Sequence, residues 1–533
     1  MGKKINIYLP LFFALTLIIG VLLGNLLLPH AQKNIFSLKL NRYDKLNDVL
    51  NYIENDYVDT ISRKTLIEKG IAGLLQSLDP HSGYIKAEEF NESNDPLKGN
   101  FDGIGIQFRV IHDTITVINT IQGGPSEKEG ILSGDRIVKI NEKNAAGIKI
   151  KDTEVMKQLK GRRGTQVAVK VYRKDEKKYY DFTITRDVIP TYSVDIAYMV
   201  NNNTGYIKLS KFSATTTGEM HEAIKKLKGL GMEKLVLDLR SNGGGYLDEA
   251  IEIADEFLPE NKMIVYTEGS HRSKRSYVAK GGGLFEQNDL VVLIDEFSAS
   301  ASEIVAGAVQ DNDRGTIIGR RSFGKGLVQE QILLGDGSAI RLTVARYHTP
   351  TGRCIQKPYT KGYEEYYNEF YIQLLEDNMN VVDSLNFADT IRYKTPGGKI
   401  VYGGGGIMPD IYIPYKAEFI SDYYRKIISK DILRDFCFDY ADKNRNQLKK
   451  YGSAEKFVSS FIISNGLFEE FIAYAESKGV ARDNEGIKSA ENALKSLIKG
   501  SIGRNIFDDP AFYPVILHAD IMFKKAMQVL EAR

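Results

Sequence analysis

The sequence predicts a multidomain protein with an α/β core, a smaller β domain inserted in the chain, and helical regions at both ends. Hydrophobic residues first repeat at helical spacing. From about Gly99 to Arg186 they alternate every second residue, and beyond that they form short apolar runs followed by helical patterns. The length of 533 residues corresponds to about three or four domains, so several independent cores are expected.

Composition excludes several classes of function. The 71 basic and 69 acidic residues leave a net charge of +2, which offers nothing that would attract nucleic acid. Cys354 and Cys437 cannot build a disulfide framework, and neither belongs to a CxxC pair. The seven histidines are scattered, without an HExxH motif. We therefore expect no metal, no cofactor and no nucleic-acid partner.

Residues 1–30 predict a membrane anchor. After Lys3 and Lys4, the stretch Ile5–Leu28 is uncharged, and as a helix it spans roughly 36 Å, enough for a hydrocarbon core of about 30 Å. The exit, Leu28-Pro29-His30-Ala31, is a poor cleavage site, although a removed export signal is the alternative. Lys3 and Lys4 lie on the short N-terminal side of this stretch, and positively charged flanks usually stay in the cytoplasm. We therefore expect residues 31–533 outside the cytoplasm, on the periplasmic side if the cell has an outer membrane.

Residues 36–98 and 99–187 predict two small domains. In the first, Leu46, Val49 and Ile53 share one helical face, which indicates a helical domain. In the second, short alternating strands surround two short helical signals, one of them a capping box of Ser126 and Glu129. This pattern is typical of a small, partly open barrel.

Residues 188–414 predict an α/β domain. The apolar run Leu235–Leu239 is followed by a glycine turn and an amphipathic helix. The run Leu290–Ile294 repeats this plan, with a turn rich in serine and alanine. Two such units favour a parallel or mixed sheet covered by helices. Residues 415–533 return to helical spacing and contain no catalytic constellation, so they are expected to form a helical region of unknown role.

Two turns of the α/β domain carry groups suited to nucleophilic catalysis. Ser300 lies between a buried strand and a helix start, where backbone N–H groups favour a developing oxyanion; the alternative is a plain helix cap. Lys325 stands between two glycines, and as a general base its pKa must fall from about 10.4 toward 7. Phe323, Leu327 and Val328 offer an apolar surround that would lower it, whereas a solvated loop lysine is the alternative. Gln329 could orient the amine without adding charge.

A third turn, Gly243–Gly245, leaves backbone N–H groups open, which suits an oxyanion hole completed by the N–H of Ala301. A simple glycine turn is the alternative explanation. The three turns together would supply a nucleophile, a base and oxyanion donors.

Six segments resemble the carboxyl-terminal processing (tail-specific) serine peptidases, over about residues 40–415. They are Leu78–Tyr84, Leu237–Gly245, Ser298–Ile304, Phe323–Gln329, Tyr347–Tyr359 and Gly405–Asp410. The resemblance implies a serine endopeptidase with an α/β core, a mixed sheet and an inserted PDZ domain. It implies Ser300 as nucleophile, Lys325 as general base and Gln329 as its orienting partner. Ala301 is implied as one oxyanion donor, and Gly244 is the candidate among Gly243, Gly244 and Gly245 for the other.

The resemblance also assigns a ligand to residues 99–187. The segment Phe101–Ile106 is similar to the PDZ carboxylate-binding loop, which points to Gly103, Ile104, Gly105 and Ile106 as peptide-binding residues. The expected partners are exported or misfolded proteins with free C-terminal ends. The sequence leaves open whether copies of the chain form a homo-oligomer.

Three rival interpretations remain at this stage. Gly319–Lys325 fits GxxxxGK of nucleotide hydrolases, but Gly326 stands where a Mg²⁺-binding Ser or Thr is required. A peptidase-like scaffold that only tethers chain ends is a second rival. A Ser–His–Asp triad is the third, with His348 as its nearest histidine.

Overall fold

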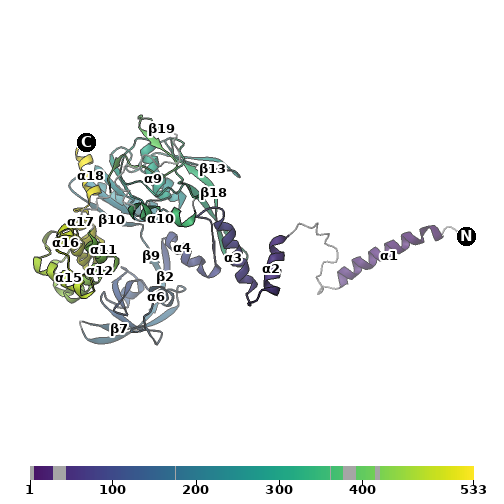
Figure 1. Cartoon of the computed structure of the whole chain (residues 1–533), viewed down its shortest axis with the longest axis horizontal. Coiled ribbons are helices and arrows are strands. Elements are labelled where there is room, and N and C mark those ends of the chain that lie inside the picture. The colour runs from purple at the N-terminus through teal and green to yellow at the C-terminus, as the bar shows by residue number, and fades with distance from the viewer. Residues whose placement is uncertain (1–4, 28–43, 175, 361, 376–391, 415–420) are drawn as a thin grey trace. The chain divides into compact units, whose positions relative to one another are not determined.

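The computed structural model describes residues 5–27, 44–174, 176–360, 362–375, 392–414 and 421–533 (Figure 1). The chain divides into two compact units, residues 1–71 and 72–533. The first contains α1 (Ile5–Leu27), α2 (Lys45–Asp56) and the beginning of α3 (Arg63–Gln76). A search of the described helices for one with the length and apolar character to cross a membrane finds none.

A six-stranded mixed sheet forms the centre of the second unit. Among the described strands its order is β10-β11-β12-β15-β16-β21, with β10 antiparallel and the others parallel. The strands are β10 (Val194–Met199), β11 (Thr204–Leu209), β12 (Lys234–Asp238), β15 (Asp289–Ile294), β16 (Thr316–Gly319) and β21 (Ile411–Tyr412). The two predicted apolar runs are β12 and β15, and the predicted mixed sheet is confirmed.

Opposite faces of this sheet are covered by helices from different parts of the chain. Leu235 and Leu237 of β12 pack with α7 (Thr216–Gly229), α8 (Leu247–Asp255) and α9 (Ala301–Asp311). Val236, between them, packs on the other face with residues of α17 (Asp509–Leu517) and α18 (Ile521–Glu531). Because successive side chains of a strand point to opposite faces, a run that is apolar throughout requires cover on both.

A second, antiparallel sheet lies beside the helices of the core. It consists of β1 (Gly83–Ile85), β18 (Ala339–His348), β13 (Met263–Gly269), β14 (Arg272–Val278) and β17 (Leu327–Leu333). The sequence assigned residues 36–98 to a helical domain, but Gly83–Ile85 is a strand paired with β18. Three residues are too few for periodicity to reveal a strand. The remaining elements here are η1 (Ala87–Glu89), α4 (Phe90–Lys98), α10 (Tyr363–Leu375), β19 (Arg392–Lys394) and β20 (Ile400–Tyr402).

The predicted alternating region forms a small β domain with a paired entrance and exit. Its elements are β3 (Ile106–Ile111), β4 (Thr114–Thr120), α5 (Pro125–Lys128), β5 (Arg136–Ile140), β6 (Lys143–Asn144), α6 (Asp152–Leu159), β7 (Gln166–Arg173) and β8 (Lys178–Thr185). The chain enters through β2 (Asn100–Gly103) and leaves through β9 (Asp187–Pro190), and these two strands pair with each other. Inward residues such as Val167, Val169 and Val171 are buried, as the alternation predicts.

The C-terminal helices have their own core and contact the rest of the second unit. The first six are α11 (Asp422–Ser429), α12 (Ile432–Lys443), α13 (Arg445–Leu448), α14 (Ala454–Ser460), α15 (Asn465–Ser477) and α16 (Asn484–Phe507), with η4 (Lys449–Tyr451) between them. Asp442 on α12 forms ion pairs with Arg136 at 2.8 Å and Lys174 at 3.0 Å in the β domain. Because α17 and α18 also cover the central sheet, the helical region contacts both neighbouring domains.

Candidate active site

Ser300 lies at the carboxyl end of β15, as the residue preceding α9. Its backbone has φ 56° and ψ −113°, a conformation that L-residues rarely adopt and that is found mostly at functional turns. The N–H of Ser300 donates to Glu303 Oε2 at 2.8 Å, and the preceding N–H of Ala299 donates to the Asn242 carbonyl at 3.0 Å. Within the described residues the N–H of Ala301 has no partner, so it remains available to an oxyanion.

Glu303, fully buried in the first turn of α9, connects the turns that contain Ser300 and Lys325. Its Oε2 accepts from the N–H groups of Ser300 at 2.8 Å and Lys325 at 2.9 Å. Its Oε1 accepts from Ser322 Oγ at 2.6 Å and from the Gly324 N–H at 2.7 Å. Burial raises the pKa of this carboxyl, while the four donated hydrogen bonds oppose that rise. Since one oxygen binds both backbones, Ser300 and Lys325 are neighbours in space.

Tyr347 provides a second connection between the same two residues. Its buried hydroxyl lies 3.2 Å from the carbonyl of Ser300 and 2.5 Å from the carbonyl of Lys325. Tyr347 lies on β18, so the second sheet contacts both turns. Glu303 and Tyr347 together hold the N–H and C=O groups of both residues.

The amine of Lys325 is in the environment that a lysine base requires. Burial, followed by the positive charge of Arg341, lowers the pKa of Lys325 to about 8. Its Nζ donates to Gln329 Oε1 at 3.0 Å, and Gln329 Nε2 in turn donates to the His81 carbonyl at 2.5 Å. Among the described hydrogen bonds none joins Nζ to the Ser300 hydroxyl. The amine is thus oriented by Gln329, which is oriented by the segment Leu78–Tyr84.

His81 belongs to an aromatic group beside the lysine. Its ring contacts Phe323, Tyr366 and Tyr367 edge-on, and its nitrogens lie 2.7 Å and 3.2 Å from the hydroxyls of the two tyrosines. Burial, and after it the charge of Lys325, lower the pKa of His81 to about 4. A histidine that is neutral at physiological pH adds no positive charge and supports an apolar surround for the amine.

The glycine turn after β12 lies directly against Ser300. A Cβ placed on Gly244, whose φ is +95°, would lie 2.8 Å from Ser300 Cβ and 2.9 Å from the Ala301 nitrogen. Only glycine allows this approach. The N–H of Gly244 donates to Asn242 Oδ1 at 2.9 Å, so in this arrangement it is already paired. Gly243, next to it, is exposed.

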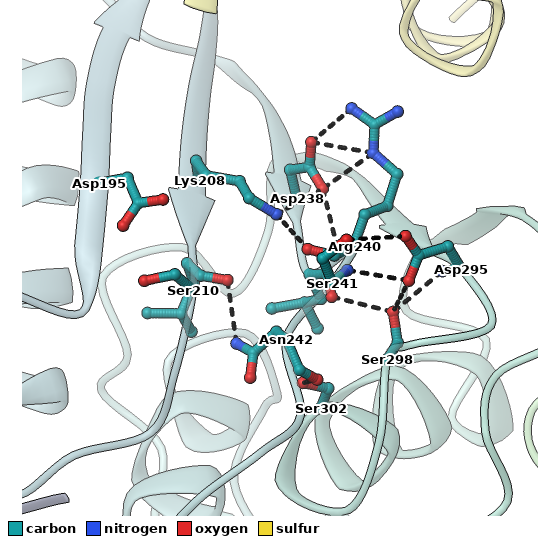
Figure 2. A network of polar contacts seen from close by, with 12 residues as sticks. Asp195, Lys208, Ser210, Asp238, Arg240, Ser241, Asn242, Asp295, Ser298 and Ser302 are labelled. Atoms are coloured by element: carbon teal, nitrogen blue, oxygen red, sulfur yellow. Dashed lines mark hydrogen bonds and ion pairs between the residues drawn. The ribbon is translucent and has the colours of Figure 1, made fainter. Parts of the chain in front are cut away.

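Polar contacts attach this turn to the residues around it (Figure 2). The buried side chain of Asn242 donates to the Leu209 carbonyl at 2.9 Å, and the backbone carbonyl of Asn242 accepts from Ser302 Oγ at 2.9 Å. The N–H of Ser241 donates to Asp295 Oδ1 at 2.9 Å. The turn is therefore attached to the residues that surround Ser300 at several points.

Two rival interpretations lose their support at this point. In a phosphate-binding loop the N–H groups around the lysine face the phosphates, but here those of Gly324 and Lys325 face the Glu303 carboxylate. His348 stacks on Tyr266 with ring centroids 4.7 Å apart, and its Nδ1 lies 3.2 Å from the Gly352 carbonyl. No described hydrogen bond joins His348 to Ser300.

The predicted peptide-binding loop connects β2 to β3, and β3 is an edge strand of its sheet. Gly103, Ile104 and Gly105 are buried, and the N–H groups of Ile104 and Gly105 have no hydrogen-bond partner among the described residues. Gly105 has φ +75°, and a Cβ there would lie 3.0 Å from Ile189 Cδ1, so glycine is required. Ile106 begins β3, which pairs with β4 alone among the described strands.

Several supporting residues escaped the sequence prediction. Glu303 had only the pattern of an acidic residue at a helix start. His81 and Tyr347 lie in two of the segments that resemble the family, but had no assigned role. Their importance arises from contacts between segments that are far apart in sequence. A glutamate within the run of mostly small and apolar residues from Ala301 to Val309 is the one signal in the sequence that could have indicated Glu303.

Replacing Glu303 by glutamine should reduce both stability and turnover. The amide nitrogen of glutamine cannot accept a hydrogen bond, so one pair of donors loses its acceptor, either Ser300 and Lys325 or Ser322 and Gly324. Each buried donor left unpaired costs roughly 1–3 kcal/mol of stability. We expect kcat to fall about a hundredfold because the two turns separate slightly. Urea unfolding and steady-state kinetics measure the two effects.

Glu249→Gln is the matched control. Glu249 Oε2 also accepts two bonds, from Thr217 N at 2.8 Å and Thr217 Oγ1 at 2.7 Å, but it connects α8 to α7. This variant should lose stability and keep its kcat. Equal kcat losses in both variants would mean that Glu303 acts on the overall fold alone.

Three family profiles match separate parts of the chain. The profile of peptidase family S41 matches residues 203–363, that of the PDZ domain matches residues 103–184, and a family of unknown function (DUF8443) matches residues 423–508. The carboxy-terminal-processing protease of Bartonella bacilliformis is 39% identical over 344 residues, which are 63% of this chain and 78% of that protein. Carboxy-terminal processing protease CtpA of Bacillus subtilis is 34% identical over 60% of this chain and 67% of its own length.

A solved structure, the photosystem II D1 C-terminal processing protease, shares 28% sequence identity with a TM-score of 0.35, and the match covers 58% of this chain and 83% of that one. The family follows from the curated relatives and the profiles. The chain belongs to the carboxy-terminal processing proteases of peptidase family S41, and it is a serine peptidase with a PDZ domain.

Proposed function

We propose that this peptidase works through a dyad in which Ser300 attacks the peptide carbonyl and Lys325 is the general base. One observation carries the proposal: the Glu303 carboxylate accepts from the N–H groups of both residues, while Gln329 orients an amine whose pKa is lowered to about 8. At that pKa about one tenth of the amine is neutral at pH 7, compared with a few ten-thousandths for an ordinary lysine.

The reaction proceeds in two steps with balanced proton transfer. Neutral Lys325 removes the proton of the Ser300 hydroxyl as its oxygen bonds to the substrate carbonyl, and the resulting ammonium protonates the leaving amine. Water then attacks the acyl-enzyme with the same amine as base, which releases the new carboxylate and restores Ser300. The free N–H of Ala301 would stabilise the oxyanion. A second donor from Gly244 requires that its N–H leave Asn242 Oδ1 when substrate binds.

Turnover should rise with pH and level off above about pH 8. The pKa of Lys325 is lowered, so the amine is protonated and inactive as a base below this value; kcat/KM should fall about tenfold per pH unit there. Between about pH 8 and the usual lysine range the unfolded chain binds the proton that the folded site has lost, so this group makes stability increase with pH in that window. A pH series of initial rates and unfolding midpoints checks both. A flat rate profile from pH 6 to 9 would contradict a lysine base.

The PDZ domain is proposed to select chain ends. The unpaired N–H groups of Ile104 and Gly105 suit a terminal carboxylate, and the open edge of β3 suits a peptide that adds as a strand. The substrates would be exported or misfolded proteins with free C-termini. Amidation of a substrate's C-terminus should then weaken binding without altering hydrolysis of short internal peptides.

Covalent labelling tests the nucleophile. A fluorophosphonate probe should modify Ser300, and mass spectrometry of the digested protein should find the adduct on that residue. The labelling rate should follow the same pH dependence as turnover. An adduct on another serine, together with continued hydrolysis of an unfolded protein substrate, would overturn the proposal.

We propose further that the catalytic part acts outside the cytoplasm. The support is the sequence of residues 1–28, in which Lys3 and Lys4 precede an uncharged apolar stretch. Alkaline phosphatase fused behind residue 43 should be active in cells, because its disulfides form only outside the cytoplasm. An inactive but intact fusion would place the catalytic part inside.

A further inference from the structure

Arg240 connects the glycine turn to the C-terminal helices. Its guanidinium donates through Nε to both oxygens of Asp238 at 3.0 Å, through Nη2 to Asp238 Oδ2 at 2.6 Å, and through Nη1 to Asp520 Oδ2. Asp238 is at the end of β12, whereas Asp520 immediately precedes α18. Only 17% of the Arg240 side chain is exposed.

The charges around Arg240 balance only when Asp520 is included. Lys208 Nζ also reaches Asp238 Oδ1 at 3.3 Å and in addition bonds the Arg240 carbonyl. Burial raises the pKa of Asp238, but Arg240 and Lys208 outweigh it and hold that pKa below its usual range. Two cations with little exposure thus face one buried carboxylate, and Asp520 supplies the second negative charge.

The two carboxylate oxygens of Asp520 bind different partners. Its Oδ1 accepts from the N–H groups of Met522 at 2.8 Å and Phe523 at 3.1 Å and so caps α18, which leaves Oδ2 for Arg240. Met522 and Phe523 pack on the central sheet with Val236. Arg240 is therefore attached to an element that is itself fixed to the core.

The backbone of Arg240 is connected to the surroundings of Ser300 by the next four residues of the turn. Arg240 is followed by Ser241, whose φ is +56°, by Asn242, which binds Ala299 and Ser302, and by Gly244, which touches Ser300. Figure 2 shows Asp238, Arg240, Ser241, Asn242 and Ser302 in this succession. A shift of the Arg240 backbone would move the turn against the nucleophile.

We infer that Asp520 is a positioning residue for the peptidase reaction: through Arg240 it holds the turn 241–245 in register with Ser300, so that the C-terminal helices complete the active site. The inference rests on the proposed function of Ser300. It gives a role to residues that lie outside the segment 203–363 matched by the peptidase family profile. Asp520 does not contact the reacting atoms and acts only through Arg240.

Asp520→Asn separates the positioning role from the helix cap. Asparagine caps helices about as well as aspartate but carries no charge for Arg240. In the full-length chain we expect kcat on an unfolded protein substrate to fall about tenfold, with KM changed by less than about twofold, because only the orientation of the turn is lost. Asp520→Glu should recover most of kcat, since a carboxylate still reaches Arg240, although glutamate is a poorer cap.

Asp483→Asn is the matched control, because Asp483 caps α16 through the Gly486 N–H at 3.0 Å and its described contacts include no ion pair. It should leave kcat unchanged. Unfolding midpoints of all three variants correct for lost folded protein. A kcat for Asp520→Asn equal to that of wild type, or a loss that Asp520→Glu shares fully, would overturn the inference. Such a result would leave the dyad intact, whereas activity retained by Ser300→Ala would overturn the proposed function instead.

Discussion

Ser300→Ala is expected to abolish hydrolysis of an unfolded protein substrate, with kcat lowered by roughly 10⁴- to 10⁶-fold. Without the hydroxyl no acyl-enzyme forms, and the remaining groups only bind and polarise the substrate. Fluorophosphonate labelling should disappear at the same time. Binding of a peptide with a free C-terminus to the PDZ domain should be unchanged, which shows that the loss concerns the chemical step.

Ser464→Ala tests the alternative that Ser300 merely caps a helix. Ser464 caps α15 by accepting from the Leu467 N–H at 3.2 Å. Its removal should cost about 1 kcal/mol of stability and leave kcat unchanged. Activity of Ser300→Ala within tenfold of wild type, combined with a similar stability loss, would reduce Ser300 to such a cap.

Lys325→Met is expected to lower kcat by about 10⁴-fold. Methionine has a similar length and fills the apolar surround, but it has no amine to take the serine proton. Because burial already opposes the charged form of Lys325, the variant should unfold at the same or a higher urea concentration than wild type. Lys325→Arg should be equally inactive, since a guanidinium stays charged throughout the accessible pH range.

His348→Ala is the comparison that separates a lysine base from a histidine base. His348 stacks on Tyr266 and has no described bond to Ser300, so most activity should survive its loss. Measurement of kcat/KM from pH 6 to 10 for both variants distinguishes the mechanisms. The dyad would be wrong if Lys325→Met remained active and His348→Ala did not.

Much of the candidate site could be proposed from the chain because its parts are local. Ser300, Lys325 and Gln329 each stand in a short segment whose chemistry is readable: a serine after a buried strand, a lysine between glycines, and an amide four residues on. The two strand–turn–helix units and the alternating strands of the β domain are also local patterns, and β12, β15 and β7 lie where those patterns predict.

The sequence by itself determined which residues have suitable chemistry and which elements present them, because periodicity and turn residues act over a few positions. Only the tertiary structure decided how those residues are held. Glu303, Tyr347 and Asp520 bind partners in other segments, and Asp520 reaches Arg240 across 280 positions of the chain. Such contacts depend on burial and on which segments pack together, and neither leaves a repeating pattern in a single sequence.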